Sequence, residues 1–166
     1  MCSPTRWRSS IEQALNNLGY TAPSHREGWC YDILLLPTFH APAWARVARD
    51  GNETYAHVAL VQSDERFEDI VIVLEEVSAT FLAQITAIPP DVLRNLDEGG
   101  RDGIVVQCWW QHHSDTFSFF AHNPTRADHI SHMHFLDSIL TVLTESFRGD
   151  QTVQKYLAHI QGYLSS

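Results

Sequence analysis

Ten histidines are the side chains of this sequence best suited to metal binding or proton transfer. Three of them, His129, His132 and His134, lie close together in the chain. If this segment is helical, positions 129 and 132 are neighbours on one face, whereas position 134 lies about 160° around the axis from position 132. One ion therefore cannot bind all three, and we interpret this group as polar residues on the solvated side of a helix.

A second arrangement of histidines remains open as an alternative. His122 ends a predicted strand just before the helix that carries His129 and His132, so these side chains could meet where the strand leads into the helix. They would then supply nitrogen ligands to a small metal-dependent hydrolase. The sequence offers no obvious third ligand of carboxylate or thiolate type, although Asp128 is nearby. We expect no catalytic residues, no metal and no cofactor, and keep the hydrolase as the alternative.

Motifs for nucleophilic catalysis and phosphate binding are missing. The sequence has no G-x-S-x-G element and no G-x-x-x-x-G-K-[ST] loop, and its glycine-rich segment 99–103 leads into a strand. Glu75 and Glu76 are adjacent on a predicted strand, so their carboxylates point to opposite faces and do not form a catalytic pair. Cys108, beside Trp109, is typical of a buried core residue.

Acidic residues dominate the charge of the chain. It carries 20 Asp and Glu against 11 Lys and Arg, a formal net charge of −9, and Lys155 is its single lysine. Such a surface repels the phosphates of nucleic acid and attracts basic proteins. We expect the carboxylates of two acidic stretches to form the docking edge for a basic protein partner: Asp64, Glu65, Glu68, Asp69, Glu75 and Glu76.

The cysteines and the N-terminus indicate the compartment. Cys2, Cys30 and Cys108 are odd in number and widely spaced, which excludes a disulfide framework and a C-x-x-C site. No apolar run follows the N-terminal charges, and none approaches the ~18 residues that a membrane span needs. We therefore expect a cytoplasmic protein that binds neither membrane nor nucleic acid.

The sequence predicts helices near both ends of the chain. A capping box at Ser9 or Ser10 begins a first helix, which stops at Gly19. Near the C-terminus, Thr125 with Asp128 resembles a second capping box and begins a long amphipathic helix. A last helix follows Asp150, and shorter helical segments are predicted after Ser78 and at 91–96.

Strand-like runs occupy the middle of the sequence. They are predicted at 29–36, 43–49, 55–62, 69–76, 104–111 and 116–121. The run Ile33–Leu36 is apolar at every position, which favours a central strand, and Asp50-Gly51-Asn52 is a hairpin turn signal. The pattern predicts one α+β domain over residues 1–166: an antiparallel sheet of about five or six strands with an N-terminal helix and two C-terminal helices packed on it.

The last two strands are unusually aromatic. A turn at Ser114-Asp115 would place Trp110 opposite Phe119 and Trp109 opposite Phe120. Since alternate side chains face opposite sides of a sheet, we expect these rings to fill a core on both faces. The alternative is an oligomeric structural module in which the hairpin forms a homodimer interface.

Two short segments carry a resemblance to a known group of proteins. Leu36–Pro42 follows a strand and Asp102–Val106 begins a hairpin, and together they resemble a pattern in small bacterial proteins of immunity-protein type, from toxin–immunity systems. The resemblance implies an acidic, cytosolic, single-domain binding protein without catalytic residues. We further expect such a protein to neutralise a cognate toxin by occlusion, with its acidic side chains meeting basic residues of the toxin's active site.

Overall fold

The computed structural model describes residues 8–22, 28–61, 67–74, 79–97, 102–113 and 115–165 of the chain. These residues form helices α1 Arg8–Asn17, α2 Ala79–Thr86, α3 Ile130–Ser146 and α4 Gln151–Leu164, a short 3-10 turn Pro90–Val92, and one β-sheet. The α+β class is as predicted, with one N-terminal helix and two C-terminal helices. The capping box predicted at Ser9 or Ser10 was wrong, because both residues already lie within α1. No helix in these ranges is long and apolar enough to cross a membrane.

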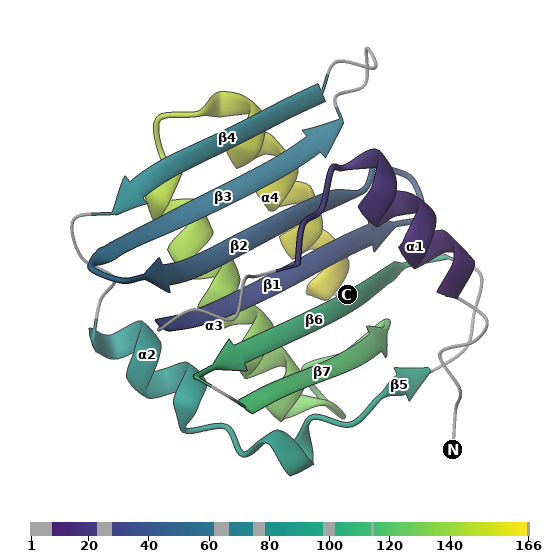
Figure 1. Cartoon of the computed structure of the whole chain (residues 1–166). Coiled ribbons are helices and arrows are strands. Elements are labelled where there is room, and N and C mark those ends of the chain that lie inside the picture. The colour runs from purple at the N-terminus through teal and green to yellow at the C-terminus, as the bar shows by residue number, and fades with distance from the viewer. Residues whose placement is uncertain are drawn as a thin grey trace.

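The sheet has the strand order β4-β3-β2-β1-β6-β7-β5 (Figure 1). The strands are β1 Gly28–Pro37, β2 Ala43–Asp50, β3 Glu53–Val61, β4 Phe67–Leu74, β5 Leu96–Asp97, β6 Ile104–His112 and β7 Asp115–His122. Within the described ranges the sheet is thus mixed and seven-stranded, since β5 pairs in parallel with β7. The prediction of a purely antiparallel sheet was wrong because a two-residue strand has no alternation for a sequence to show.

Strand β1 occupies the middle of the sheet, as its run of apolar residues predicted. Ile33, Leu34 and Leu35 are all buried because both faces of this strand are covered. The neighbouring hairpin of β2 and β3 turns at Gly51, whose φ of 60° suits a residue without a Cβ.

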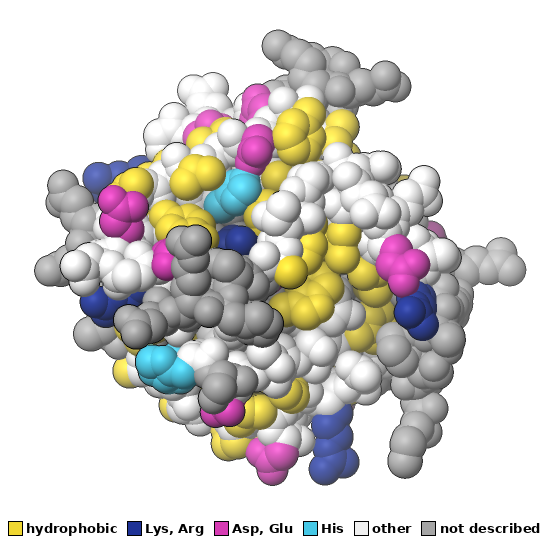
Figure 2. Space-filling model, viewed as in Figure 1, with side chains coloured by type: hydrophobic (Ala, Val, Ile, Leu, Met, Phe, Trp, Pro, Cys, Tyr) yellow, Lys and Arg dark blue, Asp and Glu magenta, His cyan; other side chains and the backbone are white. Residues whose placement is uncertain are grey.

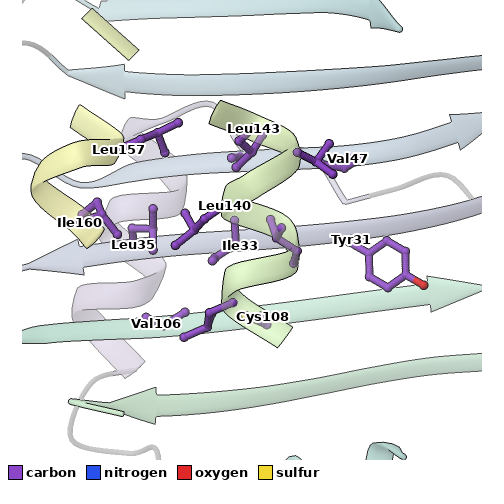
Figure 3. Close-up of a cluster of buried hydrophobic side chains, with 14 of the residues drawn as sticks. Tyr31, Ile33, Leu35, Val47, Val106, Cys108, Leu140, Leu143, Leu157 and Ile160 are labelled. Carbon is purple, nitrogen blue, oxygen red and sulfur yellow. The ribbon is translucent and has the colours of Figure 1, made fainter. Parts of the chain in front are cut away.

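The main core lies between one face of the sheet and α2, α3 and α4. In Figure 1, α3 and α4 lie behind the strands, and α2 lies at the lower left, near the ends of β1 and β6. Alternate residues of β1 face this layer, and Figure 3 shows Ile33 and Leu35 beside Leu140 of α3 and Ile160 of α4. All four of these side chains are buried. At about 1.5–3 kcal/mol for each fully buried aliphatic side chain, this larger core contributes more hydrophobic stabilisation than the smaller core on the opposite face.

A smaller core occupies the opposite face of the sheet. Ile11 and Ala14 of α1, and Leu18 in the turn after it, pack there against Leu34 and Trp44. Helix α1 has 10 residues and lies in front of the strands in Figure 1, where it covers only part of the sheet. We call this side of the sheet the open face.

Helix α3 begins later than the sequence predicted. Thr125 and Asp128 do bond to each other, with Asp128 N donating to Thr125 Oγ1 over 3.3 Å, but they stabilise a turn that precedes the helix. In α4 the predicted cap is confirmed, since Asp150 Oδ1 accepts from the backbone N–H groups of Thr152 and Val153.

The register of the aromatic hairpin differs from the predicted one by two residues. Trp110 lies opposite Phe117, and Cys108 lies opposite Phe119, in a register that pairs His112 with Asp115. His113, which follows β6, has a φ of 53°, a value typical of residues in tight hairpin turns. Since the shift is even, each ring keeps its face, and Phe119 and Phe120 are buried in the two opposite cores. Phe119 is therefore not available to the dimer interface considered above.

Candidate functional site

The acidic residues expected to bind a partner surround β4, which ends the sheet order at the side away from β5. Glu68 and Asp69 lie within β4. Asp64, Glu65, Glu75 and Glu76 fall outside the described residues. As neighbours on a strand, Glu68 and Asp69 point to opposite faces, so the two carboxylates do not form one patch. Asp69 lies on the open face and Glu68 on the face of the main core.

Strand β4 also places exposed apolar side chains on the open face, which the sequence interpretation missed. Phe67, Val71 and Val73 are 48%, 57% and 65% exposed, and Asp69 interrupts them. We call these four residues the β4 row. Figure 2 shows hydrophobic side chains over β3 and β4 on this face, with a histidine among them. The residues between them pack against the main core: Ile70, Ile72 and Leu74.

The β4 row continues into β3 through a polar contact. His57 of β3 lies opposite Val71 and bonds through Nε2 to the carboxylate of Asp69. Its ring also meets the edge of Trp44, with centroids 4.4 Å apart. Asp69 is thus held in place at the centre of the row, while its side chain remains 53% exposed. The row therefore offers one fixed carboxylate between apolar side chains.

A buried ion pair lies further along the same face. Arg46 Nε donates to Asp32 Oδ1 over 2.6 Å, and Arg46 Nη2 donates to Asp32 Oδ2 over 2.9 Å. The hydroxyl of Tyr20 donates to the same carboxylate at 3.2 Å. The guanidinium lies 5.0 Å from the ring centre of Trp44. This fork-shaped pair joins β1 and β2 to the segment after α1.

A pocket of about 480 Å³ adjoins the ion pair and is bordered by Tyr20, Cys30, Asp32 and Trp109. Burial, and next the charge of Asp32, raise the pKa of the Cys30 thiol far above its usual range. Cys30 is therefore a protonated, unreactive thiol at neutral pH. The carboxylate of Asp32 is already bonded to Arg46 and Tyr20. These groups stabilise the fold and are poorly placed for proton transfer.

The histidines proposed as alternative metal ligands each bond to a different partner. His122 Nδ1 lies 3.1 Å from Asp97 Oδ1, His132 Nε2 lies 2.8 Å from the carbonyl oxygen of Arg94, and His129 Nδ1 accepts from Thr125 N at 3.1 Å. Within the described ranges, no three His, Cys, Asp or Glu side chains converge as a metal-binding group. The structure thus does not bring His122, His129 and His132 together as a ligand set, because each ring ties a different segment to the sheet or to α3.

His132 makes the stability of the fold depend on pH. Desolvation lowers its pKa below the usual 6.5, although the bond to the Arg94 carbonyl acts in the opposite sense. Below about pH 6.5 the unfolded chain binds a proton that the folded chain resists, so stability falls as the pH drops. We expect His132→Gln to unfold with a weaker pH dependence than the unsubstituted protein, measured by urea unfolding between about pH 7.5 and pH 5.5.

The matched control for this measurement is His134→Gln, because His134 is exposed on the same helix. It should retain the pH dependence of the unsubstituted protein. If the free energy of unfolding changes equally with pH in the His132 and His134 variants, His132 is not the source of the pH dependence.

Together, the fold and the site define an α+β domain in which helices cover one sheet face and a long edge strand displays apolar and acidic side chains on the other. Comparison with protein-family models and with curated proteins finds no match for this chain. The functional conclusion therefore depends on the geometry of the described residues.

Proposed function

We propose that this protein is a non-enzymatic binding domain that holds a basic protein partner on the β4 row. In line with the resemblance noted in the sequence, the particular role proposed is that of an immunity protein, which neutralises a cognate bacterial toxin by covering its active site. The observation that carries the proposal is the row itself: three exposed apolar side chains with Asp69 between them.

Apolar and charged groups contribute differently to such a complex. Burial of Phe67, Val71 and Val73 removes apolar surface from water and slows dissociation, with the aromatic ring of Phe67 as the natural anchor. The net charge of −9 accelerates the approach of a basic protein. The acidic residues on either side of β4 in the sequence add to this attraction, as expected from the sequence pattern.

The proposal predicts that a charge in the row abolishes tight binding. The probe is the purified product of the gene adjacent to that of this protein, titrated by isothermal calorimetry. We expect the double variant Val71→Lys/Val73→Lys to bind at least about tenfold more weakly, because it removes two apolar contacts and repels a basic partner.

Val92→Lys is the matched control, because Val92 is 42% exposed in the 3-10 turn and lies outside the β4 row. It should bind as the unsubstituted protein does, and all variants should unfold at similar urea concentrations. The proposal fails if the neighbouring gene product does not bind, or if the β4 variant and the control bind alike.

A further inference from the structure

We propose that the partner contributes an extended basic segment that adds to the free edge of β4 as a further strand of the sheet. This inference rests on the proposed function, because it concerns the same strand. It specifies how the partner is held: by backbone hydrogen bonds along β4, in addition to side-chain contacts on the open face.

The two edges of the sheet differ in their protection. At one edge stands β5, which has two residues, Leu96–Asp97, and offers almost no backbone to a foreign strand. At the other stands β4, which has eight residues from Phe67 to Leu74. Soluble proteins commonly guard an edge by keeping it short, or by charged side chains, proline or a bulge. The β5 edge is protected by its shortness, whereas the longer β4 edge carries only the acidic pair Glu68 and Asp69, which repels acidic strands and not basic ones.

Apart from Glu68 and Asp69, strand β4 lacks the features that hinder pairing. Its sequence, FEDIVIVL, contains no proline, glycine or lysine. Its pairing with β3 runs without a bulge from Phe67 opposite Val61 to Leu74 opposite Thr54. In an edge strand, alternate N–H and C=O groups point away from the only neighbour. Within the described ranges, no strand pairs with the outer side of β4.

Charge selects a basic segment over a second copy of this chain. Two copies paired through β4 would bring their Glu68 and Asp69 side chains to a common edge, and each copy carries a net charge of −9. A basic strand instead places its lysine or arginine side chains on the face of Glu68, beside that carboxylate, while its alternate side chains lie on the open face. Residues that face each other across a strand pair share a face, so apolar side chains of the segment would meet Val71 and Val73.

The test uses a fluorescein-labelled peptide of about eight residues in which valine alternates with lysine, long enough to pair along the whole of β4. Binding is measured by fluorescence anisotropy. Two N-methylated versions carry methyl groups on the amides of one edge of the peptide or of the other. Strand addition uses one edge only, so one version should lose about four hydrogen bonds and bind more than tenfold more weakly, while the other binds as the parent does.

A peptide with glutamate in place of lysine tests the charge, and we expect it to bind at least about tenfold more weakly than the lysine peptide. The inference is overturned if the lysine peptide does not bind, if the two N-methylated versions bind alike, or if the glutamate peptide binds equally well. Each of these results leaves the proposed function standing if the neighbouring gene product still binds through the β4 row. Conversely, selective loss with one N-methylated version supports strand addition whatever that gene product does.

Discussion

Replacing Asp32 with alanine is expected to lower the free energy of unfolding by about 3–5 kcal/mol, the usual effect of leaving one member of a buried ion pair alone. The side chains of Asp32 and Arg46 are only 1% and 8% exposed. Without Asp32, the guanidinium loses both carboxylate bonds and keeps the bond from Nη2 to the Thr21 carbonyl at 2.8 Å. Urea unfolding monitored by circular dichroism gives the value.

The double variant Asp32→Leu/Arg46→Met distinguishes two contributions to the free energy of unfolding: the penalty of leaving Arg46 charged and unpaired, and the net stabilisation by the ion pair. Because well-packed apolar residues often replace a buried pair without loss, this variant should recover most of the stability that Asp32→Ala loses. Tyr20→Phe removes one hydrogen bond to the carboxylate and should cost only about 1 kcal/mol. A loss below about 1 kcal/mol for Asp32→Ala would show that water or a rearranged side chain compensates Arg46.

The second large effect is expected at Phe119, where substitution by alanine should cost about 3–5 kcal/mol through the cavity that it leaves. The ring of Phe119 is buried at the centre of the main core. Its centroid lies 5.2 Å from that of Phe135 in α3 and 5.2 Å from that of His132, both in edge-to-face contact. The loss is measured by urea unfolding and should not depend on protein concentration, since the ring packs within one chain.

Phe67→Ala is the control for this substitution, because it removes the same side chain from the exposed β4 row. Surface substitutions of this kind usually change stability by less than about 0.5 kcal/mol. We expect Phe67→Ala to weaken partner binding. Phe119→Ala should leave binding unchanged in the fraction of protein that remains folded. Similar stability losses for the two variants would contradict the burial that separates them.

Local pattern was sufficient for most secondary structure. The apolar run Ile33–Leu36 predicted a central strand, and Asp50-Gly51-Asn52 predicted the turn between β2 and β3. The side chain of Asp150 caps α4 as its position before an apolar stripe indicated. Each of these features depends on residues near one another in the chain, which is why the sequence alone predicts them.

What the sequence did not predict has two main physical origins: contacts between distant segments, and a register that side-chain alternation leaves open. Strand β5 forms because Leu96 pairs with Ala121 of β7. A two-residue strand is too short for its sequence to show the alternation of apolar and polar residues that predicts a strand. The aromatic hairpin kept its faces but shifted by two residues, because alternation fixes the parity of a register and not its exact value. Asp32 and Arg46 stand 14 positions apart, and only the pairing of β1 with β2 brings them together.

For the candidate site too, the sequence predicted some features and the tertiary structure decided the others. Composition alone indicated an acidic protein suited to a basic partner, because charge is a sum over residues and needs no fold. That β4 is an edge strand with Phe67, Val71 and Val73 exposed follows from the strand order and from the limited reach of α1. An alternating apolar strand is normally buried on one side by a neighbouring layer, and tertiary packing determines which side that is and what remains in water.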